Sequence, residues 1–261
     1  MLRATGIDKN FRGLEALKDA EISIDEGEAI GLVGPNGSGK STFLNILSGF
    51  EKPDAGTVTL FGKGVTGREP WDIAALGLRR TFQYANQPLR MSVMELMLLG
   101  SNSAKGATVR HSLFRRSSTA HEETAAVSKA RELLVRLRLD KLSDHPGGML
   151  SGGQQKLLSL GMALMSDPKI LMLDEPTAGV NPALRTELAQ RLRELQTEGM
   201  TMLIIEHDMP FVAKTCDRVY VLDKGSVLTT CRPDKLASNP EVLAAYLGRA
   251  GQAAGPPGKV Q

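Results

Sequence analysis

The chain has 261 residues, of which 41% are hydrophobic and 23% are charged, a balance typical of a globular domain with a sizeable core. Its 32 basic and 29 acidic side chains leave a net charge of only +3, which argues against a dedicated nucleic-acid-binding protein. No apolar stretch approaches the roughly 20 residues that cross a bilayer, and residues 1–10 lack the pattern of a secretory signal. Cys216 and Cys231 are too few for a disulfide framework, so we expect two reduced thiols.

The first third of the chain predicts strands around one glycine-rich loop. Residues 1–34 read as strands, and they end in the wholly apolar run Ala29–Val33. A helical pattern follows the loop and stops at Gly49. Further strands are predicted at 57–61 and 79–83.

The remainder of the chain alternates helices with apolar strands. From Ser92 to about Leu139 the pattern is helical, with a Gly/Ser/Arg-rich interruption at 100–118. Beyond Gly148 the predicted elements are, in order, a helix at 154–165, a strand at 170–173, a helix at 182–196, and strands at 202–205 and 219–222. This order predicts an α/β fold with a mostly parallel sheet covered by helices. The Gly/Ala/Pro-rich tail after Gly248 is predicted to be disordered.

The glycine-rich loop follows an apolar strand and opens a helix, which is the context of a phosphate-binding loop. Its glycines let backbone N–H groups curl around a phosphate, and the helix N-terminus adds a favourable dipole. Lys40 supplies a positive charge to the β- and γ-phosphates, and the Ser41 hydroxyl can bind Mg²⁺. The predicted nucleotide-contacting residues are Gly34, Pro35, Asn36, Gly37, Ser38, Gly39, Lys40, Ser41 and Thr42.

Two adjacent carboxylates end the apolar strand at 170–173. Buried carboxylates are costly unless a cation or proton accompanies them. Asp174 is therefore a candidate Mg²⁺ ligand, and Glu175 suits the role of base for an attacking water. A solvated turn would account for Glu175 alone, but not for an apolar strand that carries both acids.

The string Leu150-Ser151-Gly152-Gly153-Gln154 precedes these acids and resembles the signature of the ABC transporter ATPases. Ser151 and the two glycines can present a hydroxyl and bare N–H groups to a phosphate. In that family this surface faces the γ-phosphate held by a second subunit, so two chains enclose two ATP molecules. The local alternative is a helix cap made by Ser151.

Three more positions match the family and acquire roles from the resemblance. Phe11 resembles the aromatic residue that stacks on adenine, Gln83 the glutamine that reaches Mg²⁺ and the attacking water, and His207 the histidine that contacts the γ-phosphate. The resemblance thus implies ATP and Mg²⁺ as cofactors, with Ser41, Gln83 and Asp174 at the metal. At 178–182 this chain has Asn181 where many relatives have aspartate.

The resemblance covers residues 1–248 and implies a RecA-like P-loop core with an antiparallel β subdomain. A helical subdomain with the signature is expected at about 84–160, and 249–261 are expected to be a disordered tail.

The finer strings resemble the ATPases of branched-chain amino acid importers and of their amide and urea relatives. These strings are 11–17, 80–83, 178–182, 206–209 and 240–248, together with the long insert at about 100–130. Departures occur at 84–93, where the family touches its permease, and at 229–233. The insert also carries basic residues at 105–116, which favour a solvated face and leave contact with anionic headgroups as an alternative.

The implied partners are a second ATPase subunit, identical or paralogous, integral-membrane permease subunits and a periplasmic or extracellular substrate-binding protein. The implied location is the cytoplasmic face of the cell membrane. Two other functions stay open at this point: a lipopolysaccharide-type exporter ATPase, and a soluble ABC ATPase outside transport.

Overall fold

The computed structural model describes residues 1–81, 90–101 and 116–253. The chain divides into two compact units, one formed by residues 1–76 and 193–261 and the other by residues 77–192.

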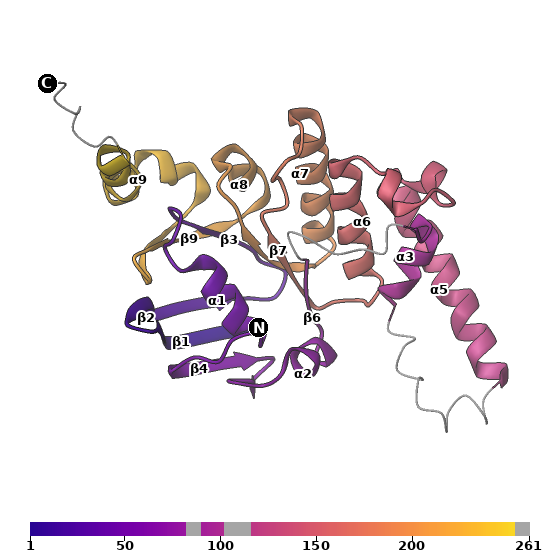
Figure 1. Ribbon diagram of the computed structural model, residues 1–261, viewed down its shortest axis with the longest axis horizontal. Coiled ribbons are helices and arrows are strands. Elements are labelled where there is room, and N and C mark those ends of the chain that lie inside the picture. The colour runs from indigo at the N-terminus through magenta and orange to yellow at the C-terminus, as the bar shows by residue number, and fades with distance from the viewer. Residues whose placement is uncertain (82–89, 102–115, 254–261) are drawn as a thin grey trace, which may run out of the picture. The chain divides into compact units, whose positions relative to one another are not determined.

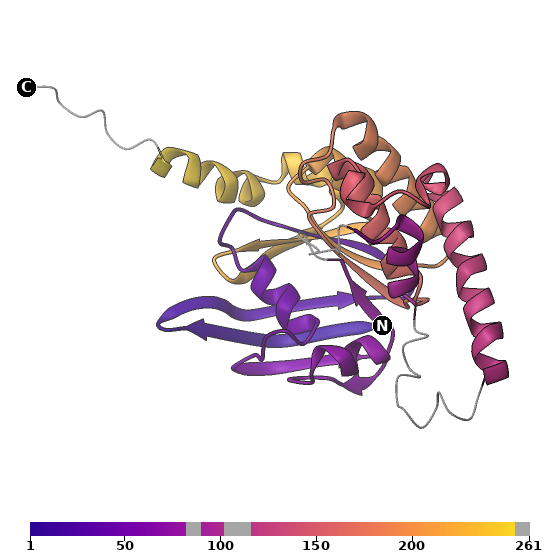
Figure 2. The same ribbon diagram turned by 45° about the vertical axis from the view of Figure 1, so that its right-hand side comes forward.

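The first unit contains an antiparallel sheet with the order β2-β1-β4-β5. Its strands are β1 (Leu2–Phe11), β2 (Leu14–Ile24), β4 (Ala55–Leu60) and β5 (Lys63–Gly64). Alternate residues of β1 and β4 are buried, as a sheet with one covered face requires. Helix α1 (Lys40–Leu47) lies next to β2 in both views (Figures 1 and 2). The predicted N-terminal strands are confirmed.

The same unit holds a second set of strands with the order β10-β9-β3-β8. These are β3 (Ala29–Val33), β8 (Thr201–Ile205), β9 (Arg218–Asp223) and β10 (Ser226–Cys231). Strand β3 runs parallel to β8 and β9, and every residue of β3 and β8 is buried. Continuous apolar runs are typical of parallel strands covered on both faces, so the predicted parallel arrangement is confirmed here.

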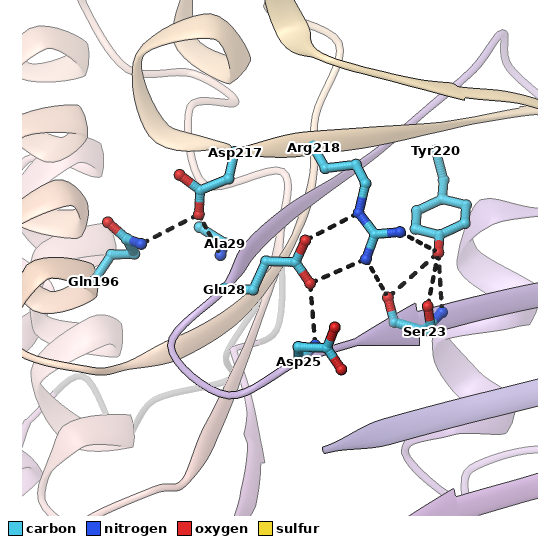
Figure 3. A network of polar contacts seen from close by, with 8 residues as sticks. All are labelled: Ser23, Asp25, Glu28, Ala29, Gln196, Asp217, Arg218 and Tyr220. Atoms are coloured by element: carbon cyan, nitrogen blue, oxygen red, sulfur yellow. Dashed lines mark hydrogen bonds and ion pairs between the residues drawn. The ribbon is translucent and has the colours of Figure 1, made fainter.

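A polar network fastens the starts of β3 and β9 to β2 (Figure 3). The Arg218 guanidinium donates to both carboxylate oxygens of Glu28, over 2.9 and 3.0 Å, and also to the Ser23 carbonyl. The Asp217 carboxylate accepts from the Ala29 amide at 3.0 Å. Two parallel Arg–carboxylate bonds fix geometry better than a single bond does. The network therefore sets the register at one end of the strands whose other ends carry the site.

The second unit contains the parallel pair β6 (Leu78–Arg80) and β7 (Ile170–Asp174) with several helices. The helices are α3 (Val93–Leu99), α5 (Arg116–Arg136), α6 (Gly152–Leu164) and the first part of α7 (Pro182–Thr197). Helices α3, α5 and α6 pack against one another (Figures 1 and 2). A Cβ on Gly100 would lie 2.2 Å from the Met162 carbonyl, so glycine is needed for this approach. The helical subdomain expected at about 84–160 falls within this unit, and its limits stay a prediction.

Several elements did not follow from hydrophobic periodicity because they are short or partly exposed. They are α2 (Pro70–Ala75), α8 (Met209–Thr215), and the 3-10 turns η2 (Asp140–Leu142), η3 (Gly147–Met149) and η4 (Pro233–Ser238).

The C-terminal segment corrects one expectation. Helix α9 (Pro240–Ala253) continues past Gly248, so residues 249–253 are helical and not part of a disordered tail. Alanine and arginine in this stretch are good helix formers, and they outweigh Gly248 and Gly251. Residues 254–261 lie outside the described part of the chain.

Both cysteines are free, as expected. Burial raises the pKa of the Cys216 thiol to about 12 and also raises the pKa of Cys231, so burial favours the protonated form of both thiols. Within the described ranges, no helix combines the length and the apolarity that a bilayer span requires.

Candidate functional site

The glycine-rich loop lies where predicted, between β3 and α1 of the first unit. Gly34 has a φ of 153°, and a Cβ there would lie 2.0 Å from the Leu222 carbonyl oxygen. Gly39 has a φ of 106°, and its Cβ would lie 2.5 Å from the Ala16 carbonyl oxygen. Only glycine fits both requirements. The loop is therefore a backbone cradle and not an ordinary strand-to-helix turn.

Strand register brings three segments to one edge of the sheet. Leu32 of β3 is opposite Ile205 of β8, and Val33 is opposite Val221 of β9. The loop after β3, His207 after β8 and the turn after β9 consequently share the carboxyl edge of these parallel strands. Ligands of open α/β sheets bind at such edges.

The turn between β9 and β10 is hydrogen-bonded to the phosphate loop. The Gly225 amide donates to the Ser38 carbonyl at 2.9 Å, and the Gly225 carbonyl accepts from the Lys18 amide at 3.0 Å. The loop is thus fastened through this turn to β2. Nothing in the local sequence pattern indicated this support, because it joins three segments far apart in the chain.

Lys40 is held in place by the loop itself. Its ammonium donates to the carbonyls of Gly34 and Pro35, over 2.8 and 2.9 Å, and the residue is buried. Since α1 begins at Lys40 with no side-chain cap, its first amides are not used by a capping side chain. A bound phosphate can accept from these amides and from Lys40.

Tyr246 of α9 is a further residue at this loop that the sequence analysis did not single out. Its hydroxyl oxygen is buried, near the Gly34 amide. Burial raises the pKa of Tyr246, while the nearby Gly34 amide lowers it. Segment 240–248 therefore reaches Gly34, the first glycine of the loop. In the sequence this segment served only as one of the strings that carry the family resemblance.

Replacing Gly34 by alanine is expected to weaken ATP binding about tenfold or more. The new Cβ would push the loop away from Leu222, and a displacement costing about 1.4 kcal/mol in binding is a tenfold change. Gly62→Ala is the matched control, because Gly62 lies outside the loop and also has a positive φ, of 74°, but no atom within 4 Å of the added Cβ. Calorimetric titration with ATP measures both, and equal losses would contradict the role given to the Leu222 contact.

Phe11 ends β1 at a tight hairpin and is 41% exposed. Arg12 and Gly13 both have positive φ, at 46° and 92°, and Phe11 pairs with Leu14. Two positive-φ residues are typical of a type I′ turn, which holds the flanking strands in a fixed register. The Phe11 ring thus lies at the end of the hairpin with part of its surface open to solvent.

His207 is exposed immediately after β8, and its backbone is fixed by its neighbour. Glu206 is almost wholly buried, and its carboxylate accepts from the His207 amide at 3.0 Å. Asp208 then caps α8 by accepting from the Phe211 amide at 3.0 Å. Sequence reasoning named His207 but overlooked the buried Glu206 that orients its backbone. Gln83 lies outside the described residues.

Asp174 ends β7 in the second unit and pairs with Arg80 of β6. The Arg80 Nη2 lies 2.9 Å from the Asp174 Oδ2, and the two side chains are 8% and 13% exposed. A buried carboxylate requires such a cation, so the predicted need for a positive partner is met in this structure by an arginine. Arg80 was not predicted, because strand pairing alone brings it beside Asp174.

Glu175 follows with an unusual backbone. Its φ is 46°, in the left-handed region that non-glycine residues rarely adopt. Its carbonyl accepts from the Ala178 amide at 3.1 Å and from the Lys156 ammonium at 3.3 Å. Such backbone strain persists only where surrounding contacts hold it, and it is concentrated at functional sites.

The signature segment begins α6 with a capping box. The Ser151 hydroxyl accepts from the Gln154 amide at 3.3 Å, and the Gln154 side chain accepts from the Ser151 amide at 2.9 Å. Gly152 has open space where a side chain would be, whereas a Cβ on Gly153 would collide with Leu184 of α7. Ser151 therefore does cap helix α6, as the alternative to a phosphate site predicted. The cap leaves Gly152 exposed.

Asn181, which replaces the aspartate of many relatives, also has a local role. Its side-chain oxygen accepts from the Leu184 amide at 3.0 Å at the start of α7. Asparagine and aspartate are equally good in this capping position, so the replacement preserves the helix start.

The donors present suit Mg²⁺, which prefers oxygen ligands and usually binds through one or two carboxylates, water and phosphate oxygens. Asp174 offers a carboxylate and Ser41 an exposed hydroxyl. Within the described ranges, no group of three or more His, Cys, Asp or Glu could hold a metal ion by itself. Asp174 and Ser41 thus each supply an oxygen of the kind that Mg²⁺ prefers, and their role at a metal stays a prediction.

The phosphate cradle, the strand-end acids and the parallel sheet define a P-loop nucleotide-hydrolysing domain. The family model described as ABC transporter matches residues 17–178, and this chain belongs to that family. The chain is an ABC ATPase, which confirms the expected class of fold and reaction.

Individual proteins extend this likeness over nearly the whole chain. A probable branched-chain amino acid transport ATP-binding protein, LivG, of Archaeoglobus fulgidus is 40% identical over 248 residues, covering 95% of each chain. The high-affinity branched-chain amino acid transport ATP-binding protein LivG of Salmonella typhimurium is 35% identical, covering 96% of this chain and 98% of the relative. The solved ADP conformation of an ATP-binding cassette of an ABC transporter superimposes with a TM-score of 0.83 at 39% identity, covering 95% of this chain and 98% of that one.

Proposed function

We propose that this chain powers import of branched-chain amino acids as the ATPase subunit of an ABC importer. The observation that carries the proposal is the similarity to LivG proteins over 95% or more of the chain. The relatives' names support neither the exporter nor the non-transport alternative, and they do not mention urea.

At the nucleotide, each residue has a proposed task. Lys40 and the first amides of α1 bind the phosphates, and Phe11 stacks on the base. Glu175 orients and deprotonates the attacking water, and His207 stabilises charge on the γ-phosphoryl group. Gln83, which lies outside the described residues, keeps its proposed task at the metal and the water. Mg²⁺, when bound with ATP near Ser41 and Asp174, would neutralise charge on the phosphates.

The signature face gives the reason for a second ATPase copy. Gly152 is exposed at the start of α6 and has open space where a side chain would be, so a γ-phosphate from another subunit could be bound there. ATP then bridges two subunits, and its hydrolysis removes the bridge. Because ATP favours the closed dimer, the difference in affinity drives the conformational cycle.

The remaining partners follow from the proposed transport. Integral-membrane permease subunits would carry the cargo path, and an external binding protein would deliver the cargo. This places the chain at the cytoplasmic face of the membrane.

Uptake of labelled leucine, with labelled urea in parallel, tests the cargo in cells whose own copy carries Glu175→Gln. We expect leucine uptake to be lost and urea uptake to persist. Glu21→Gln, at an exposed position of β2, is the matched control and should leave both unchanged. Loss of urea uptake alone would show that the protein serves a urea importer. If both uptakes survive while the protein is ATPase-inactive, the importer function is wrong.

A further inference from the structure

Lys9 is a buried lysine on β1 whose charge has no part in the functions described above. The residue is 9% exposed, whereas lysine is almost never buried unless it is paired. It precedes the proposed base-stacking residue Phe11 by two positions, so both side chains lie on the same side of the strand.

Three oxygens surround the Lys9 ammonium. It lies 2.8 Å from the Glu51 carboxylate, 3.3 Å from the Asp54 carboxylate and 2.8 Å from the Lys52 carbonyl. The Asp54 carboxylate also accepts from the Asn10 amide at 2.7 Å. Segment 51–54, which follows α1, is thereby bound to β1 through the consecutive residues Lys9 and Asn10.

The same ammonium lies over the Phe11 ring, 5.2 Å from its centroid. A cation within about 6 Å of an aromatic face is attracted by the ring quadrupole. Phe11 remains 41% exposed, so the Lys9 ammonium does not cover the whole surface of the ring. The cluster therefore holds the ring in one orientation and leaves part of it open.

The charges in this cluster are stable near neutral pH. The hydrogen bond to Glu51 raises the pKa of Lys9, against the lowering effect of burial. The hydrogen bond from the Asn10 amide lowers the pKa of Asp54. The Lys9 ammonium over the Phe11 ring is therefore charged at neutral pH.

We propose that Lys9 is a positioning residue for the adenine subsite, which orients Phe11 and links it to the segment following the phosphate-loop helix. This inference rests on the proposed stacking of Phe11 on the base. Segment 51–54 follows α1, and α1 begins at Lys40 of the phosphate loop, so one chain of contacts joins the base end of the nucleotide to its phosphate end.

A purely structural tie between β1 and 51–54 would affect the whole site, whereas a base-positioning role affects only ligands that carry a base. The probes are ATP and inorganic tripolyphosphate, each titrated calorimetrically into the full-length protein without Mg²⁺ so that no hydrolysis occurs. We expect Lys9→Met to weaken ATP binding about two- to fivefold, the range of an exposed cation–π contact, and to leave tripolyphosphate binding unchanged.

Two matched variants complete the test. Lys9→Arg keeps a cation over the ring and should retain most of the ATP affinity. Lys63→Met removes an exposed lysine of β5 and should change the binding of neither ligand. Equal weakening of both ligands by Lys9→Met, or no weakening of ATP, would overturn the proposal. If Lys9→Met does not fold, Glu51→Gln replaces it. We expect this variant to weaken ATP binding less than Lys9→Met would and to leave tripolyphosphate binding unchanged.

Phe11→Leu separates this inference from the function on which it rests. If Phe11 stacks on the base, Phe11→Leu weakens ATP binding, and adding Lys9→Met to it has no further effect on ATP. Unchanged ATP affinity in Phe11→Leu would refute the stacking itself. A loss in Phe11→Leu with no loss in Lys9→Met would leave the stacking intact and refute the role of Lys9.

Discussion

Glu175→Gln is expected to slow ATP hydrolysis by about 10²–10⁴-fold, the usual contribution of a positioned general base, while ATP binding is retained. Glutamine has the size of glutamate but cannot accept a proton from water. The contacts from Ala178 and Lys156 go to the backbone carbonyl of Glu175, so the substitution preserves them and the left-handed backbone.

Phosphate release by the purified protein and calorimetric binding of ATP measure the two quantities separately. Glu132→Gln, an exposed position of α5, is the control and should hydrolyse ATP at the normal rate. A second expected result is that ATP-loaded Glu175→Gln accumulates as a dimer in gel filtration, because the proposed bridging phosphate is no longer removed. Hydrolysis within a fewfold of the unaltered rate would show that another group activates the water.

Arg80→Met is expected to lower the free energy of unfolding by about 3–5 kcal/mol, the usual cost of removing one partner of a buried ion pair. Asp174 would keep its carboxylate in a site that is 13% exposed, without the guanidinium 2.9 Å away. The mechanism of destabilisation is the uncompensated charge and not the lost attraction alone.

Urea denaturation measures this loss, and two variants isolate its cause. Arg138→Met removes an arginine that is 71% exposed and pairs with Glu187 at 3.3 Å, so we expect a loss of about 1 kcal/mol or less. Combining Arg80→Met with Asp174→Asn removes the stranded charge and should recover part of the stability. A double variant no more stable than Arg80→Met would contradict the charge explanation.

Much of the site could be predicted because its parts are local. The phosphate loop is a run of glycines between an apolar strand and a helix, and the strand-end acids follow directly on Ile170–Leu173. The helix cap at Ser151 likewise depends on residues three positions apart. Their spacing in the chain fixes their spacing in the structure, so pattern and structure agree.

Family resemblance contributed a different kind of prediction. Nothing in the residues around Phe11 or His207 by themselves indicates a nucleotide, and these roles stay proposals. The tail after Gly248 was predicted to be disordered from its glycine, glutamine, alanine and proline content, whereas helix α9 extends to Ala253.

The sequence by itself determined the class of the protein, the phosphate loop, and the acids that a nucleotide and its cation would meet. The tertiary structure alone decided the long-range partners. Arg80 pairs with Asp174, the Glu51 and Asp54 carboxylates surround Lys9, and the Gly225 amide donates to the Ser38 carbonyl. Each of these pairs joins residues far apart in the chain, and only strand register and packing bring them within hydrogen-bond distance. Local periodicity carries no information on such partners, which is why they appear only in the folded chain.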